Sequence, residues 1–288
     1  MNFKSVYEDY KSYFEIELKK STDALNNSEE NLINSMKYSL LAGGKRIRPV
    51  LMLMVADVLS VKKEQVLPFA IALEYIHTYS LVHDDLPAMD DDDLRRGNPT
   101  NHVVFGEDMA ILCGDALLNK AYEIIFRNIG SIYSINASRI LSSYAGMNGM
   151  VGGQAFDIKN LSYPQTIETL EKIHENKTGK LITASTIIPS CFAGDLYFSE
   201  LKLYGEKLGL LFQITDDLLD LSSTKEIMGK NVNKDKDANK LTYVTLLGEN
   251  SAKNYAKTTL DDAINSISNV ENNEVLIEFA KYVYNRKN

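Results

Sequence analysis

Two groups of aspartates in this sequence have the residue type and spacing to bind a metal ion. Each group lies at the end of an apolar stretch with helical periodicity. The acids are Asp84, Asp85 and Asp90 in HDDLPAMDDDD (83–93), and Asp216, Asp217 and Asp220 in FQITDDLLD (212–220). Like charges on one helix face lower stability unless a cation neutralises them. Mg²⁺ does so through oxygen ligands, characteristically one or two carboxylates together with substrate phosphates.

Helix geometry suits the second group better than the first. Asp216 and Asp220 are four residues apart, so their carboxylates lie about 40° apart on one face. Asp84 and Asp90 are six residues apart, roughly 240° around a regular helix. Pro87 lacks an N–H and clashes with the residue four before it. We therefore expect a break near residues 84–87 that brings Asp90 back beside Asp84.

A solvated acidic helix end is the plainer interpretation of either group alone. An EF-hand is a poor alternative, because the loop spacing, the central glycine and the final glutamate are missing. Two such groups, each on an apolar helix, favour a metal site.

Basic residues lie beside glycine turns and near both acidic groups. They are Lys45, Arg46 and Arg48 in GGKRIRP (43–49), Arg95 and Arg96 after the first group, Lys177 before Thr178 and Gly179, and Lys230 and Lys240 after the second group. Arginine offers planar forks for phosphate oxygens and lysine a point charge. Any one pair is equally well explained as exposed surface charge. Acids that bind metal and cations that bind phosphate together describe a site for a diphosphate ester.

The elements that position these residues are predicted to be helices. Only six prolines and sixteen glycines interrupt 288 residues, and apolar residues recur at helical spacing almost throughout. The expected helices cover 3–18, 32–41, 50–59, 69–82, 107–126, 134–149, 164–173, 178–192, 196–220, 251–268 and 273–285. The apolar run 181–198 should be a buried helix that ends near Pro189, not a membrane span. Period-two alternation is lacking, so we expect one all-α domain over 1–288 with about ten or more helices.

Composition limits the partners and the compartment. A net charge of −8 argues against nonspecific binding to nucleic acid or to anionic membranes. Cys113 and Cys191 lie in apolar segments without a spaced motif, which is typical of reduced core cysteines. The first twenty residues are charged throughout, so a signal peptide is not expected there. These features predict a cytoplasmic protein.

Taken together, these motifs resemble those of the short-chain trans-isoprenyl diphosphate synthases, of the bacterial farnesyl diphosphate synthase type. The matching segments stand in the family's order and cover most of the chain. They are GGKRIRP (43–49), HDDLPAMDDDDLRRGNPTNH (83–102), GDALL (114–118), GGQAFD (152–157), HENKTGKL (174–181), GLLFQITDDLLD (209–220) and GKNVNKDKDANKLTY (229–243). The resemblance implies an all-α isoprenoid-synthase fold around a central cavity and a homodimer.

The resemblance also assigns roles to residues. It implies three Mg²⁺ ions, with Asp84, Asp90 and Asp216 as direct ligands and Asp85, Asp217 and Asp220 in support. Allylic diphosphate would be bound by Arg95, Lys177, Lys230 and Lys240, and isopentenyl diphosphate by Lys45, Arg48, His77 and Arg96. Thr178 and Gln213 would lie near the reacting carbons. His77 on its own would be a core histidine, and the sequence departs from the family in Asn233 and Asn239, which are usually glycine.

The implied reaction is Mg-dependent head-to-tail prenyl transfer. Metals and cations would stabilise the departing diphosphate, isopentenyl diphosphate would attack the allylic cation, and a proton would be lost, plausibly to the released diphosphate. In the family, a bulky residue five positions before the first aspartate limits product length. Here that residue is Tyr79, which favours the fifteen-carbon farnesyl diphosphate, although helix geometry makes Ser80 face the cavity better.

Three alternatives remain open at this point. The first is a geranylgeranyl diphosphate (C20) synthase. The second is an inactive regulatory subunit, although both aspartate motifs are intact. The third is a class I terpene cyclase, which DDLLD and the basic isopentenyl diphosphate set disfavour.

Overall fold

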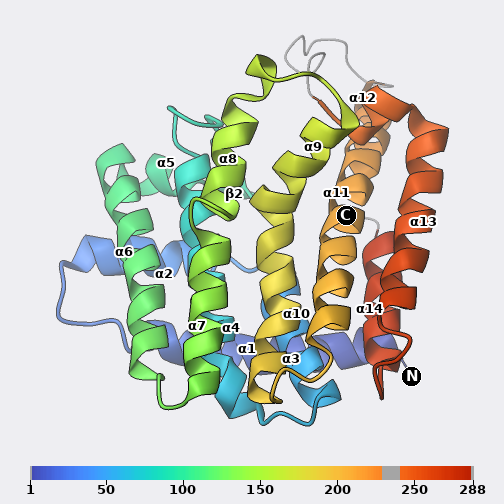
Figure 1. Ribbon diagram of the computed structural model, residues 1–288. Helices are drawn as coiled ribbons and strands as arrows, with labels where there is room; N and C mark the ends of the chain where they lie inside the picture. The colour runs from blue at the N-terminus through green and yellow to red at the C-terminus, as the bar shows by residue number, and fades with distance from the viewer. Residues whose placement is uncertain (1, 229–240, 287–288) are drawn as a thin grey trace. The chain divides into compact units, whose positions relative to one another are not determined.

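The computed structural model describes the backbone of residues 2–228 and 241–286 and the side chains of 2–221 and 241–286 (Figure 1). The chain divides into two compact units, 1–141 with 191–194, and 142–190 with 195–288. We describe each unit by itself, and the expected single domain stays a prediction. Within the described residues, no helix is both long and apolar enough to cross a membrane.

The first unit consists of helices and one small hairpin. In chain order they are α1 (Phe3–Asp23), α2 (Glu30–Leu40), α3 (Ile47–Val58), α4 (Lys63–Asp84), β1 (Leu94–Arg95), β2 (Asn98–Pro99), α5 (Asn101–Phe105), α6 (Glu107–Arg127) and most of α7 (Ile132–Ala145). The two strands pair antiparallel, with Arg95 opposite Asn98. Helix α3 is apolar on nearly all sides and its residues 49–56 are buried, which makes it the centre of this unit's core.

Helices α4 and α6 pack closely because of one glycine. A Cβ atom added to Gly114 on α6 would lie 2.0 Å from Nε2 of His83 on α4. The His83 Nε2 atom is 3.0 Å from the Ile111 carbonyl oxygen, to which it donates. His83 directly precedes Asp84, so this contact fixes the end of α4 that leads into the first acidic group.

The second unit is entirely helical in the part that the structure describes. Its elements are the rest of α7, α8 (Met150–Ile158), η1 (Asn160–Ser162), α9 (Ile167–His174), η2 (Glu175–Gly179), most of α10 (Lys180–Phe192), α11 (Phe198–Met228), α12 (Tyr243–Leu247), α13 (Glu249–Ser266) and α14 (Glu274–Asn285). Helix α11 packs against α13 and α14 (Figure 1). The buried Tyr204 hydroxyl on α11 donates to the Leu276 carbonyl on α14 at 2.7 Å.

The structure confirms an all-α chain and corrects several helix limits. Helix α4 begins at Lys63 and contains Pro68, so the expected start at residue 69 was wrong. Helix α10 contains Pro189 and ends at Phe192, the expected end of the helix over 178–192. A proline removes one backbone hydrogen bond, and the buried side chains around both prolines keep the helix regular. The short helices α5, α8 and α12 were not predicted, because so few residues show little periodicity.

Candidate active site

The first acidic group is formed by a chain reversal at the end of α4. The helix ends at Asp84, and the Asp90 backbone N–H donates to the Asp84 carbonyl at 2.8 Å. The Asp92 N–H donates to the Asp85 carbonyl at 3.3 Å, and Asp91 has φ 55°. The expected break therefore exists, and it brings the backbones of Asp84 and Asp90 together despite their separation of six residues.

Asp85 is the buried member of the first acidic group. Its side chain is only 4% exposed, and Nε of Arg95 donates to its two oxygens at 2.7 and 2.8 Å. Burial raises the pKa of the Asp85 carboxyl, and the contact with Arg95 counteracts only part of the rise. Asp85 thus holds the β1–β2 hairpin against α4 through Arg95, whose expected role for the allylic diphosphate stays a prediction.

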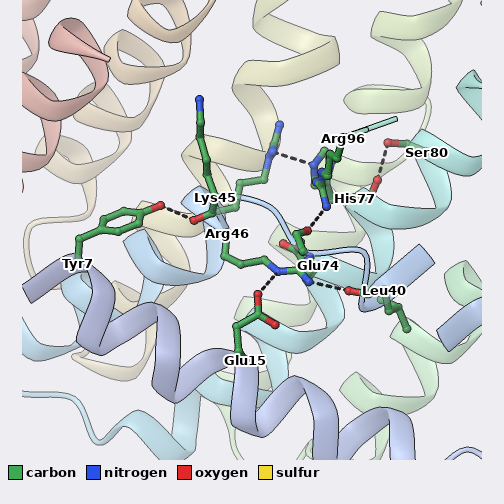
Figure 2. Close-up of polar contacts among 11 residues, drawn as sticks. Tyr7, Glu15, Leu40, Lys45, Arg46, Glu74, His77, Ser80 and Arg96 are labelled. Carbon is green, nitrogen blue, oxygen red and sulfur yellow. Dashed lines mark hydrogen bonds and ion pairs between the residues drawn. The ribbon is translucent and has the colours of Figure 1, made fainter. Parts of the chain in front are cut away.

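Four basic side chains of the first unit lie together around the turn before α3. They are Lys45, Arg48, His77 and Arg96. Arg96 donates to the Gly43 carbonyl, and its guanidinium carbon would be 2.7 Å from a Cβ at Gly44 (Figure 2). Arg48 Nη1 is 3.2 Å from His77 Nε2. This arrangement can bind an anion, and the role of these residues for isopentenyl diphosphate stays a prediction.

His77 is neutral and has a defined tautomer in this arrangement. Burial first, and then the nearby charges of Arg48, Arg96, Arg46 and Arg95, lower the pKa of His77 well below 6.5. A guanidinium can only donate, so Nε2 accepts from Arg48 and the proton is on Nδ1. His77 therefore orients Arg48 and keeps one ring N–H as a donor.

The two residues expected to set product length lie next to each other on α4. Tyr79 is 7% exposed, and its ring meets the His83 ring edge-on with centroids 5.8 Å apart. Ser80 is half-buried, and its hydroxyl donates to the His77 carbonyl at 2.9 Å.

The second acidic group is on α11, where the one-face geometry of Asp216 and Asp220 is present. Asp220 is exposed and Asp216 half-exposed. Asp217 is 8% exposed, and its Oδ2 accepts the Tyr243 backbone N–H at 2.8 Å. Asp217 therefore fixes the start of α12, a structural role that parallels that of Asp85.

Arg286 contacts the second acidic group and was not predicted from the sequence. Its side chain is 4% exposed, and Nη2 lies 2.7 Å from Asp216 Oδ1. The guanidinium also donates to Thr215 Oγ1 and to the Phe212 carbonyl, and stacks on the Phe212 ring at 3.7 Å. Seventy residues separate Arg286 from Asp216, so no local pattern could indicate the pair.

Lys177 and Thr178 belong to η2, a short π-helical segment. Such segments are rare and occur frequently at functional sites. Two glycines permit it, because a Cβ at Gly153 would lie 2.1 Å from the Lys177 nitrogen and one at Gly209 2.8 Å from Gly179 Cα. Lys177 Nζ donates to Asp157 Oδ2 at 2.6 Å. GGQAFD (152–157) therefore packs against this segment and binds its lysine.

Two glutamines complete the description of the second unit's polar residues. Gln213 Nε2 lies 3.5 Å from Asp216 Oδ2, at the limit of a hydrogen bond. Gln154 was not predicted as a site residue, although it lies in GGQAFD beside Gly153; its buried Oε1 has no hydrogen-bond partner among the described residues. Lys230, Lys240, Asn233 and Asn239 lie outside the described residues.

The acidic groups suit magnesium by their chemistry. All candidate ligands are hard carboxylate oxygens, and Mg²⁺ characteristically uses one or two of these plus phosphates and water. Among the described side chains, no three or more His, Cys, Asp or Glu gather into a complete metal cage.

Comparison with known proteins identifies the relatives of this chain. The sequence pattern of the family described as "Polyprenyl synthetase" matches residues 29–282. Farnesyl diphosphate synthase of Micrococcus luteus is 42% identical over 247 residues, covering 85% of each chain. Geranylgeranyl diphosphate synthase of Cyanophora paradoxa is 40% identical over 264 residues, covering 89% of this chain and 88% of the relative.

The fold agrees with solved structures. The apo crystal structure of an FPP/GFPP synthase from Zymomonas mobilis superimposes with a TM-score of 0.86 at 32% identity, covering 98% of this chain and 99% of that one. The expected isoprenoid-synthase fold is therefore confirmed.

Proposed function

Since the chain belongs to the polyprenyl synthetase family, as a short-chain trans-prenyl diphosphate synthase, we propose that its final product is farnesyl diphosphate. It would condense isopentenyl diphosphate first with dimethylallyl diphosphate and then with geranyl diphosphate. The observation that carries this choice of product is Tyr79, a buried aromatic residue on α4 five positions before Asp84. An aromatic ring there would stop chain growth at fifteen carbons.

We propose Asp84, Asp90 and Asp216 as the direct magnesium ligands, assisted by Asp220, for three ions in the loaded enzyme. Asp85 and Asp217 would support them indirectly, because each already accepts hydrogen bonds from protein groups. When bound, magnesium stabilises the negative charge that develops on the departing allylic diphosphate.

The chain's own cations divide between the two substrates. Lys45, Arg48 and Arg96 would bind isopentenyl diphosphate, and the Nδ1–H of neutral His77 is a further donor. Lys177 would bind the allylic diphosphate with Lys230 and Lys240, assisted by Arg95, and Asp157 holds Lys177 at 2.6 Å. Thr178 and Gln213 would lie near the reacting carbons. None of these side chains is an obvious general base, so the released diphosphate would take the proton.

The product assay tests both the activity and the chain length. Purified protein is incubated with Mg²⁺, isopentenyl diphosphate and each allylic starter, and the products are analysed by chain length. We expect C15 from dimethylallyl and geranyl diphosphate. A C20 product would favour geranylgeranyl diphosphate synthase, which relatives of near-equal identity also support. A lack of any condensation would favour the inactive subunit.

Two variants of α4 test the role of Tyr79 directly. Tyr79→Ala should lengthen the main product beyond C15, because it removes the ring. Ser80→Phe is the matched opposite change; it should shorten the product to C10 if residue 80 faces the growing chain. An unchanged product distribution in Tyr79→Ala would contradict the assignment of chain length to this residue.

We also propose a homodimer, with no nucleic-acid partner and a cytoplasmic location. Helix α6 supports the dimer, because Ile111, Leu112 and Phe126 are 47%, 53% and 66% exposed, and α5 adds Val103 and Val104. Apolar side chains gathered in this way typically mark a protein interface.

A further inference from the structure

The turn that carries Lys45 and leads into Arg48 at the start of α3 is held in place by a buried arginine. The Arg46 side chain is fully buried. Its Nε donates to Glu15 Oε1 on α1 at 2.8 Å, and its Nη1 to Glu74 Oε1 on α4 at 2.7 Å. Its Nη2 donates to the Leu40 carbonyl, the last residue of α2, at 2.6 Å. One guanidinium thus joins three helices (Figure 2).

The backbone of Arg46 shows that this position is enforced. Its φ of 53° is left-handed, an uncommon conformation for a residue with a side chain. Such residues persist where the surrounding structure over-determines them, often at functional sites. Gly43 and Gly44 also have positive φ, and the Tyr7 hydroxyl donates to the Lys45 carbonyl. The whole turn is therefore specified by side-chain contacts from α1 and α4.

The contacts of Arg46 connect to the segment of Lys45 and Arg48 and to the helix of His77. Arg46 lies between Lys45 and Arg48 in the sequence, and in Figure 2 its side chain extends toward Glu15 while that of Lys45 extends away from it. Glu74 precedes His77 by one turn of α4, and His77 contacts Arg48 at 3.2 Å. Loss of the Arg46 contacts would thus displace Lys45 and Arg48 relative to His77.

We propose that Arg46, with Glu15 and Glu74, is a positioning residue that presets Lys45, Arg48 and His77 for the diphosphate of isopentenyl diphosphate. The inference rests on the proposed function of those cations. Arg46 itself is buried beneath the turn and does not contact the substrate. Its contribution is to remove the cost of ordering the turn when the anion binds.

Charge-preserving and charge-changing variants separate positioning from electrostatics. Arg46→Lys keeps the charge but cannot form the three-way fork. Glu15→Gln removes a negative charge beneath the cations, so electrostatics alone would tighten anion binding. Positioning predicts weaker binding in both variants. We expect the KM for isopentenyl diphosphate to rise about tenfold or more, equivalent to about 1.4 kcal/mol, with smaller changes in kcat and in the KM for geranyl diphosphate.

A matched control exists at another ionic contact that also involves α1 and α4. Asp57 on α3 accepts from Tyr10 on α1 at 2.5 Å and pairs with Lys63 on α4 at 3.0 Å. Asp57→Asn should leave both KM values unchanged. If it raised the KM for isopentenyl diphosphate as strongly as Arg46→Lys, general loosening of the unit would explain the effect and the proposal would be wrong.

A second variant tests whether weaker binding could result from loss of folding alone. Replacing a buried ion pair with apolar residues is often neutral or stabilising, so Arg46→Met/Glu74→Met should remain folded by circular dichroism and thermal melting. Its KM for isopentenyl diphosphate should nevertheless be higher than that of the wild type. A folded double variant with wild-type KM would overturn the proposal.

Direct binding distinguishes this proposal from the proposed function. Titration calorimetry with inorganic diphosphate, in the presence of a chelator, measures anion binding without turnover. If the wild type binds diphosphate more tightly than Arg46→Lys but forms no product, the proposed reaction fails and the positioning role stands. If wild type and Arg46→Lys bind equally while the wild type is active, only the positioning role fails.

Discussion

At the scale of single residues, adjacent aspartates in each acidic group have different roles. Asp85 and Asp217 are buried and accept hydrogen bonds from Arg95 and from the Tyr243 N–H. Asp90 and Asp220 are exposed. The second aspartate of each Asp-Asp pair therefore ties down the chain segment that follows, whereas Asp90 and Asp220 lie at the surface.

This difference predicts that one alanine variant on α11 lowers stability and that another weakens metal binding. Asp217→Ala leaves the Tyr243 N–H without its acceptor and should cost about 1–3 kcal/mol in the free energy of unfolding. Asp220→Ala should change stability by less than about 0.5 kcal/mol, as is usual for exposed sites, yet weaken Mn²⁺ binding measured by paramagnetic resonance. Urea unfolding and metal titration of both proteins check this. Equal losses of stability would argue against separate roles.

His77 predicts a specific dependence of stability on pH. Its pKa is lowered well below 6.5 by burial and by Arg48, so below pH 6.5 the unfolded chain binds a proton that the folded chain does not. The free energy of unfolding should therefore fall as pH falls below 6.5, by at most about 1.4 kcal/mol per pH unit from this group. His77→Gln, whose side-chain oxygen can still accept from Arg48, should have a shallower slope in urea unfolding between pH 6.5 and pH 5.5. Identical slopes would mean that His77 does not contribute.

At the scale of elements, close glycine contacts fix the π-helical segment η2. The Cβ of Gly153→Ala would meet the Lys177 nitrogen at 2.1 Å, and backbone atoms cannot move aside cheaply. We expect this variant to displace Lys177, raising the KM for geranyl diphosphate and lowering kcat by about tenfold or more, a loss of about 1.4 kcal/mol. Gly130→Ala, where no atom lies within 4 Å, is the control and should behave as the wild type. A fully active Gly153→Ala would show that η2 need not hold this conformation.

The sequence predicts long elements well and local exceptions poorly. Periodicity indicated α6, α11, α13 and α14, because each buries one continuous stripe against its neighbours. Pro68 was misleading, because tertiary packing outweighs the loss of one hydrogen bond. The reversal after Asp84 could be anticipated, since Pro87 made a regular helix there unfavourable. The π-helical segment could not, because it depends on glycines from α8 and α11.

At the scale of the whole molecule, the candidate site could also be predicted from the sequence only in part. The acids and most cations could be selected by type and spacing. The contacts that hold them could not be predicted, because Glu15 and Glu74 come from different helices and Arg46 from the turn before α3. Arg286 likewise is seventy residues from Asp216. Such pairs are properties of the folded chain and leave no local pattern.

The proposed homodimer gives a prediction at this scale. Leu112→Glu/Phe126→Glu places two charges on the exposed apolar face of α6, and a charge buried in an interface is costly. We expect this variant to sediment as a monomer in analytical ultracentrifugation while the wild type sediments as a dimer. Leu161→Glu, at a residue that is 79% exposed on η1, is the control and should remain dimeric. A double variant that stays dimeric would exclude this face.

The ion pair between Arg286 and Asp216 has a consequence for the order of events in the reaction. Asp216 already has a counter-ion in Arg286, so a lone hydrated magnesium ion bound there as we propose would have to compete with a guanidinium held by several other contacts. Free metal would therefore occupy this position poorly. An ion already bound to the allylic diphosphate would bind more strongly, because the diphosphate adds contacts of its own. Arg286 would then leave Asp216 when this substrate enters, and not in response to the concentration of free metal.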